Sequence, residues 1–222
     1  MVTNYSENNH LLLIGKVASE KKFSHEIYGE KFYLFDIEVP RLSEISDIIP
    51  IMTSERLITN CEIIPEKKIS VEGQFRSYNG YENEKNKLVL TVFAKEVKEV
   101  PEEETEEYKE SVSNQVTLSG YICKKPIYRQ TPFKREISDI LLAVNRAYNK
   151  SDYIPCIAWG RNARFSQNLD VGTEVKITGR VQSRNYEKKF EDGTVTNKVA
   201  YEISVISMEV TTNNEDVNDI VV

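Results

Sequence analysis

The sequence predicts an all-β protein made of two similar small barrels in tandem. The first observation is an internal repeat with an offset of 105 residues, in which Val39 and Arg41 correspond to Val144 and Arg146. The second observation is the pattern of each copy, which consists mostly of short runs rich in Val, Ile and aromatic residues, separated by turn residues. The length of 222 residues suits two domains of ordinary size.

The repeat extends through most of each copy, and its matched positions keep one order with gaps only between them. Further matched pairs are Gly15 with Gly120, Ser46 with Ser151, Asp47 with Asp152, Pro50 with Pro155, Arg56 with Arg161 and, after one inserted residue, Gly73 with Gly179 and Ser77 with Ser183. So many matches in one order indicate a duplication.

Each copy contains five expected strands and one expected short helix. In the second copy the strands are expected at 116–123, 137–146, 152–160, 174–186 and 199–210, with the helix from Asn162 to Leu169. In the first copy the strands are expected at 11–17, 32–39, 48–52, 67–78 and 87–97, with 53–64 in the helix position. Five strands with one helix between the third and the fourth is the order of the OB-fold, a small Greek-key barrel.

The segments outside the two copies are acidic. Residues 101–115 carry six Glu against one Lys and are interpreted as a solvated linker, with a short helix over the glutamates as the alternative. The tail at 211–222 is polar and is expected to fray. The predicted organisation is therefore an OB-fold domain at 1–100, the linker, a second OB-fold domain at 116–210 and the tail.

Composition argues against several classes of protein. No run approaches the roughly 18 apolar residues of a membrane helix, and the first residues lack the basic and apolar regions of a secretory signal. The expected location is therefore the cytoplasm. No Ser/His/Asp set, P-loop or GxGxxG motif is present, and we expect a protein that is not an enzyme.

Cysteine and histidine usage predicts neither a metal site nor a cofactor. Cys61, Cys123 and Cys156 are too few and too scattered for a zinc ribbon or a disulfide framework, and we expect each to act as a small core residue. The two histidines, His10 and His25, could not form a metal site alone.

The charge is distributed unevenly along the chain. The whole chain has a net charge of −6, but residues 116–210 carry 15 basic against 10 acidic residues, a local charge of +5. Because local charge decides the attraction of phosphates, the second copy is the better candidate for binding a nucleic acid.

The third expected strand of the second copy carries the clearest sign of a binding surface. Side chains alternate between the two faces of a strand, so Ile154, Cys156 and Ala158 are expected to face the core. Tyr153 and Trp159 then face outward. Aromatic rings exposed on such a barrel can stack on unpaired bases.

The fourth expected strand repeats this pattern with basic residues. Arg180, Arg184 and Tyr186 share one face, and Arg161 follows the third strand, so guanidinium groups lie beside the rings. The alternative is that Tyr153, Trp159 and Tyr186 cover the core or a protein interface.

Two hairpins of the second copy are expected to extend this surface with basic and aromatic residues. The first, KKPIYRQTPFKRE, contributes Tyr128, Arg129 and Arg135, and the second, EKKFEDGTVTNK, contributes Lys188 and a turn at Asp192-Gly193. Basic residues interleaved with aromatic ones suit a flexible clamp on a nucleic-acid backbone, although solvated hairpins without a ligand are the alternative.

Two stretches of the second copy, DILLAVNRAYNKSDYIPCIAWGRNARF and GTEVKITGRVQSRNYEKK, closely resemble the bacterial single-stranded DNA-binding protein family. The family shows an AVNR strand end, an aromatic-x-P-C-x-x-W/F-G run and a G-x-x-V-x-x-x-G-x-x-x-x-R strand. The resemblance spans 116–210 and implies that Tyr153, Trp159 and Tyr186 are stacking aromatics, with Arg161 and Arg184 at basic positions.

The first copy resembles that family only through the repeat. Ile48, Ser54 and Gly80 stand where the second copy has Tyr153, Trp159 and Tyr186, with Tyr78 and Tyr81 nearby as possible substitutes. We expect the first barrel to have lost its stacking platform and to serve weak binding, dimerisation or partner docking.

The function expected from these observations is sequence-tolerant binding and protection of single-stranded DNA in replication, recombination or repair. The alternative is a protein-interaction or primosome-type OB module that binds strands weakly. Because the family assembles four barrels around a strand, the resemblance implies a homodimer that presents four OB folds. The acidic end Asp219-Ile220-Val221-Val222 resembles the family's tip that recruits replication and repair proteins, although its tether is short and the final Pro-Phe is missing.

Overall fold

The computed structural model describes residues 8–41, 43, 45–82, 85–101, 113–189 and 193–211. Most of the expected linker and tail, at 102–112 and 212–222, lies outside the described residues, and so do Phe190 and Asp192 of the second hairpin. Within the described ranges, no helix has the length and apolar character needed to cross a membrane.

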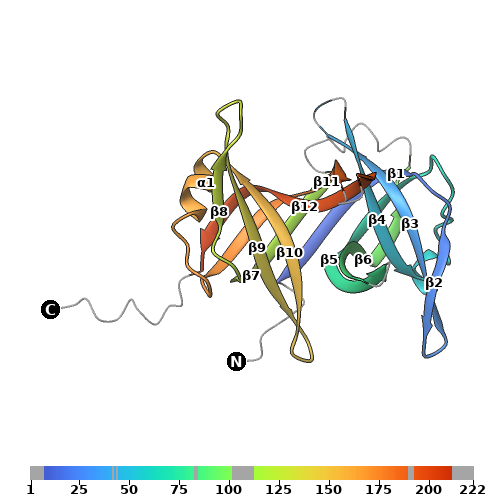
Figure 1. Cartoon of the computed structure of the whole chain (residues 1–222). Helices are drawn as coiled ribbons and strands as arrows, with labels where there is room; N and C mark the ends of the chain where they lie inside the picture. The colour runs from blue at the N-terminus through green and yellow to red at the C-terminus, as the bar shows by residue number, and fades with distance from the viewer. Residues whose placement is uncertain are drawn as a thin grey trace.

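The first barrel consists of six strands and a short helix in the order β1, β2, β3, β4, η1, β5, β6 (Figure 1). Their bounds are β1 Asn9–Val17, β2 Lys22–Ile27, β3 Glu30–Pro40, β4 Ser46–Ser54, the 3₁₀ helix η1 Glu55–Ile58, β5 Lys68–Glu82 and β6 Lys85–Glu99. The helix expected over 53–64 is reduced to this single 3₁₀ turn, which Ser54 caps by accepting a hydrogen bond from the Arg56 amide.

The second barrel repeats this order. Its bounds are β7 Asn114–Ile122, β8 Ile127–Gln130, β9 Glu136–Arg146, β10 Lys150–Trp159, α1 Arg161–Ser166, β11 Glu174–Lys189 and β12 Val195–Val210. The helix ends three residues before the expected position, and β7 begins at Asn114, inside the segment assigned to the linker.

The all-β fold of two tandem OB barrels is confirmed, with one addition in each barrel. The short strand β2 was not expected, whereas β8 lies in the hairpin expected at 124–136; each pairs with the next strand, β3 or β9. Their sequences, such as KFSHEI in β2, are mostly exposed and lack the apolar alternation that marks a half-buried strand.

Each barrel closes through its first strand, because β1 pairs with both β3 and β5, and β7 pairs with both β9 and β11. The repeated glycines permit this closure. A side chain on Gly15 would meet the Glu38 carbonyl oxygen at 2.3 Å, and one on Gly120 would meet that of Ala143 at 2.4 Å. Gly73 and Gly179 lie at the bulges in the β5–β6 and β11–β12 hairpins.

The core is formed by the inward-facing residues of both barrels. Fully buried side chains include Leu11, Phe35, Ile51 and Phe75 in the first barrel and Leu118, Ile122, Leu142 and Ile154 in the second. Cys61 and Cys156 are buried in this core, as expected, whereas Cys123 is half-buried.

The two barrels lie side by side and share one sheet of 12 strands, joined where β1 pairs with β7 (Figure 1). The pairing is antiparallel, and Leu11 lies opposite Val116, its own repeat equivalent. The barrels are therefore related by an approximate twofold axis through this pair. Asn9 exchanges two side-chain hydrogen bonds with the Phe75 backbone, and Asn114 makes the same two bonds with Val181.

Two further junctions, related by the same axis, hold the barrels together. At the Asp47 junction, formed by Arg41, Asp47 and Ser183, the buried Asp47 carboxylate accepts a hydrogen bond of 2.6 Å from the Ser183 amide. At the Asp152 junction, formed by Arg146, Asp152 and Ser77, the buried Asp152 carboxylate accepts one of 2.7 Å from the Ser77 amide. The repeated Arg, Asp and Ser therefore join one barrel to the other.

Candidate nucleic-acid interface

The outer face of β10 carries two exposed aromatic rings, as the alternation predicts. Tyr153 is 48% exposed and Trp159 is 39% exposed, while Ile154, Cys156 and Ala158 on the opposite face are buried. The rings are therefore accessible to a ligand. They are also well separated: six residues of an extended strand span about 20 Å, so the two rings would contact different bases.

The outer face of β11 places guanidinium groups beside a third ring. Tyr186 is 38% exposed, and the Arg184 guanidinium lies over its ring at 5.8 Å from the centroid. Arg184 also approaches the Glu202 carboxylate at 3.7 Å, a loose ion pair in which more than half of the Arg184 side chain remains exposed. Arg180 lies half-exposed on the same face, whereas Val181 is buried.

Several of the expected residues gather near Trp159. In the sheet Ile137 pairs with Trp159 on one side and with Arg129 on the other, so Arg129 belongs to the same face. Arg129 makes a bidentate ion pair with Asp139, at 2.9 and 3.1 Å, which holds its guanidinium on the surface. Arg161 is exposed at the first position of α1.

The hairpin residues are placed differently from one another. The Tyr128 ring packs against the core and its hydroxyl donates a hydrogen bond of 2.7 Å to Glu136, so Tyr128 helps to fix the hairpin. Arg135 is exposed, and the neighbouring Phe133 is 87% exposed. Lys188 is exposed near the end of β11, far along the hairpin from Arg180.

The Tyr153 end of the surface lies at the junction of the two barrels. The Tyr153 amide donates a hydrogen bond of 2.7 Å to the Ser77 hydroxyl of the first barrel. Beside it is a cavity of about 380 Å³ that both barrels line. Its lining includes Tyr153, Arg146, Lys150, Tyr78 and Leu88.

The sequence analysis did not name three basic residues at this end, Arg76, Arg146 and Lys150, as binding residues. Arg146 and Lys150 flank the β9–β10 turn, and Arg76 reaches them from β5 of the first barrel. The repeat singled out Arg146, but its neighbours come together only through the packing of two barrels, which the strand pattern does not contain.

Tyr186 lines a different groove, of about 390 Å³, near the twofold axis. Both barrels contribute to it through Pro50 and Pro155, Leu88 and Val199, and Tyr78 and Tyr186. Most of these side chains are apolar, and Tyr78, Leu88, Val199 and Tyr186 are each more than a third exposed.

The first barrel has aromatic residues, but at other positions than the second. Ile48 and Ser54 occupy the places of Tyr153 and Trp159, as the repeat indicated, and Ser54 is buried. The Arg76 guanidinium instead lies over the Phe93 ring at 4.2 Å, and His25 stacks on Phe32 with centroids 4.9 Å apart. Our expectation that this barrel has lost its stacking platform did not consider these side chains, which lie on β2, β3, β5 and β6.

Metal binding finds no support in the part of the chain that the structure describes. No group of three or more His, Cys, Asp or Glu side chains there could hold an ion. Burial raises the pKa of the Cys156 thiol, which leaves it protonated and unsuited to coordinate metal.

The second barrel matches the Single-strand binding protein family over residues 113–211. A single-stranded DNA-binding protein of Clostridium tetani is 36% identical over 103 residues, which cover 42% of this chain and 70% of that protein. The chain belongs to this family. The single-stranded DNA-binding protein 1 of Staphylococcus aureus is 37% identical over 83 residues, and there the chain spans half the length of the relative.

Solved structures show the same fold across both barrels. The wild-type single-stranded DNA-binding protein of Thermus aquaticus superposes with a TM-score of 0.73, at 16% identity, over 92% of this chain and 93% of that one. Family membership rests on the second barrel, and the structural likeness extends the fold to the first. Members of the family are binding proteins without enzymatic activity.

Proposed function

We propose that the protein binds single-stranded DNA without sequence preference, through bases stacked on Trp159, Tyr153 and Tyr186 and phosphates held by neighbouring arginines. The observation that supports this most directly is the exposure of all three rings on the outer face of β10 and β11, beside Arg129, Arg180 and Arg184. Buried rings would have left no platform for a base.

Stacking explains why such binding tolerates any sequence. Every base has an aromatic face, and each stacked base contributes about 1–3 kcal/mol whatever its identity. The arginines add phosphate contacts that release counterions, so the affinity falls as salt rises. In the cell, this activity would protect single strands during replication, recombination or repair, and proteins of those processes are the partners we infer.

The test uses Trp159, which is the only tryptophan in the chain. Titration with oligo-dT should quench its fluorescence, because a stacked base contacts the indole ring directly. The same titration at several salt concentrations should give a plot of log affinity against log salt with a negative slope. Unchanged Trp159 emission at a saturating oligonucleotide concentration would overturn the proposed platform.

We also infer that two chains associate and present four barrels. The resemblance to the family supports this, because the family assembles four barrels around a strand and one chain supplies two. Light scattering after size-exclusion chromatography should give about twice the chain mass of 25.6 kDa. A mass of one chain at every concentration would contradict the dimer.

A protein-docking role for the first barrel is the second candidate. The exposed apolar side chains Phe23 and Ile27 on β2, at the edge of the sheet, favour it. Replacing both by Ser should remove a docked protein without changing the quenching of Trp159.

A further inference from the structure

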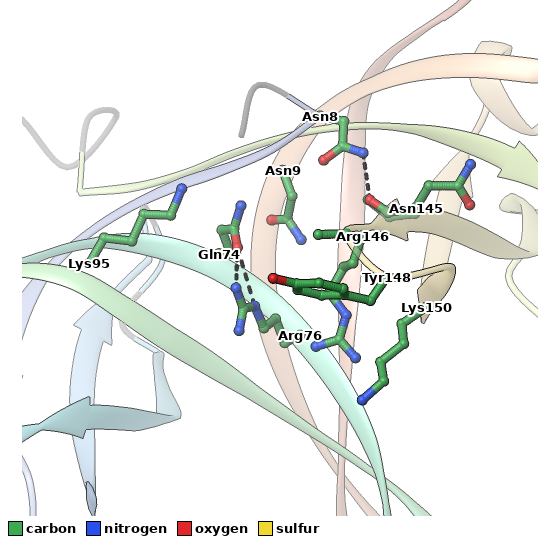
Figure 2. A pocket seen from close by; sticks show the side chains of 11 residues that line it. Asn8, Asn9, Gln74, Arg76, Lys95, Asn145, Arg146, Tyr148 and Lys150 are labelled. Atoms are coloured by element: carbon green, nitrogen blue, oxygen red, sulfur yellow. Dashed lines mark hydrogen bonds between the residues drawn. The ribbon is translucent and has the colours of Figure 1, made fainter. Parts of the chain in front are cut away.

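A basic pocket of about 400 Å³ lies between the barrels, at the turn that joins β9 to β10 (Figure 2). The second barrel contributes Arg146 and Lys150, and the first contributes Arg76 from β5 and Lys95 from β6. The remaining lining is neutral: Asn8, Asn9, Gln74, Val144, Asn145, Ala147 and Tyr148. Four cationic side chains and no carboxylate therefore face this space.

The positive charge of the pocket is poorly balanced. Arg146 has one carboxylate contact, in which its Nε lies 3.3 Å from Asp152 Oδ2, and neither buried atom has a hydrogen-bond partner within the described chain. Burial and the nearby Arg146 charge both lower the pKa of Arg76. No carboxylate of the described residues lies within 4 Å of the Lys95 or Lys150 ammonium. An anion would relieve this imbalance.

Contacts with its neighbours fix the Arg76 side chain at the pocket. Arg76 is oriented by two hydrogen bonds to Gln74 Oε1, at 2.7 and 3.2 Å, and by the Phe93 ring beneath it. Figure 2 shows Arg146 and Lys150 below the Tyr148 ring and Arg76 to its left. Tyr148 is 94% exposed and has a φ of 61°, which is unusual for a bulky residue and places an aromatic ring at the mouth of the pocket.

The pocket is connected to the aromatic surfaces of both barrels. Arg146 also lines the cavity beside Tyr153 and a third cavity, of about 490 Å³, that contains Phe93 and His25 of the first barrel. Arg76 lines the basic pocket and this third cavity. A chain of cavities therefore runs from Tyr153 in the second barrel, past Arg146, to Phe93 in the first.

We propose that the basic pocket binds phosphate groups of the DNA strand where it crosses from the second barrel to the first. The inference rests on the proposed function and adds to it a crossing point. Beyond this point the first barrel extends the binding surface through Arg76 and Phe93. Guanidinium and ammonium groups suit phosphate oxygens, and the exposed Tyr148 ring offers a base a place to stack beside them.

The test compares short and long oligonucleotides on the full chain. One OB-fold occupies about 4–16 nucleotides, so a short oligo-dT of about 8 nucleotides fits the second barrel and one of about 35 reaches both. The variant Arg76→Gln/Lys95→Gln/Lys150→Gln removes three charges and leaves Arg146 to pair with Asp152. Glutamine suits position 76 because the repeat-equivalent residue on β11 is Gln182.

The variant should bind the long oligonucleotide at least tenfold more weakly than the wild type at low salt. Each lost phosphate contact lowers the salt slope by about 0.7 for a single strand, so three lost contacts should reduce it by about 2. At a saturating concentration, the short oligonucleotide should still quench Trp159 as in the wild type, because Trp159 lies at the opposite end of β10 from Lys150. Lys98→Gln is the matched control, because Lys98 is on the same strand as Lys95 but does not line the pocket.

The possible outcomes separate the two proposals. An unchanged long-oligonucleotide affinity and salt slope in the triple variant, with wild-type quenching intact, would overturn the crossing point alone. If oligo-dT does not quench Trp159 fluorescence in the wild type, the proposed function is overturned. An equal loss with Lys98→Gln would show a general effect of charge and would also overturn the crossing point.

Discussion

The Asp47 and Asp152 junctions began as copies of one arrangement and now differ in charge balance. At the Asp47 junction, Arg41 donates two hydrogen bonds to Asp47, at 2.6 and 2.8 Å, and a third to the Ser183 carbonyl at 3.0 Å. At the Asp152 junction, Arg146 makes one contact of 3.3 Å and lies close enough to Arg76 to lower its pKa. The first junction is a closed ion pair, and the second is left with positive charge.

Substitutions around the junctions explain the difference. The position of Arg76 is held by Gln182 in the other copy, and that of Lys150 is held by Ile45. The Asp152 junction thus has two nearby positive charges that the Asp47 junction does not have. A duplicated contact can keep its structural role on one side and acquire a ligand on the other, because the two sides no longer share their neighbours.

Removing the charge of Asp47 is expected to lower the stability of the protein more than any other substitution proposed for the two junctions. Asp47→Asn should lower the free energy of unfolding by about 3–5 kcal/mol, because it leaves the mostly buried Arg41 without its carboxylate. Asp152→Asn should cost clearly less, since burial raises the pKa of Asp152 and so works against its charge. Urea unfolding followed by circular dichroism measures both variants.

The two variants serve as controls for each other, because they change repeat-equivalent residues in the same way. Equal losses of stability would show that the junctions are energetically alike and would contradict the difference in charge balance. A larger loss of stability for Asp152→Asn would mean that the Asp152 carboxylate stabilises the fold more than the Asp47 carboxylate does.

A smaller effect is expected from the aromatic rings. Trp159→Ala should weaken binding of oligo-dT by about 1–3 kcal/mol, or roughly fivefold to 150-fold, because one stacked base is lost. The stability should change little, since Trp159 is 39% exposed. Fluorescence polarisation of a labelled oligonucleotide measures the affinity without the tryptophan signal.

The matched control for Trp159→Ala is Phe23→Ala in the first barrel. Phe23 lies on β2, at the far edge of the sheet from the second barrel, and is 59% exposed. Its ring contacts that of Tyr33 edge-to-face. The affinity should not change in this variant. A Trp159→Ala protein with wild-type affinity would remove the indole from the binding surface.

A substitution on β6 tests whether the first barrel contacts a long strand. Phe93→Leu should weaken the binding of a long oligo-dT by up to about 1 kcal/mol. The substitution removes the ring that orients Arg76, and with it the cation–π contact between the two side chains. Binding of a short oligo-dT, followed through Trp159, should be unaffected. An unchanged affinity for the long oligonucleotide would place Phe93 outside the strand path.

The repeat and the strand pattern were enough to predict two OB barrels, and alternation along β10 placed Tyr153 and Trp159 on the outside. Local signals failed where the contact partner is distant in the sequence. Asp47 and Ser183 are far apart in the chain, and so are Arg76 and Arg146. The composition of the hairpin did not show how its residues pack. The Tyr128 hydroxyl donates a hydrogen bond to Glu136, and the Tyr128 ring packs against the core.

The smallest expected effect is the pH dependence of the Asp152 junction. Burial is the largest cause of the raised pKa of Asp152, so the folded protein holds this proton more tightly than the unfolded chain does. The stability that Asp152 contributes is therefore greatest below its unfolded pKa of 3.8 and is lost as the pH rises through the higher folded value. The difference in unfolding free energy between the wild type and Asp152→Asn should thus shrink from pH 4 to pH 7. A difference that grows over this range would mean that the Arg146 and Arg76 charges outweigh burial, and the Asp152 junction would then be balanced like its counterpart.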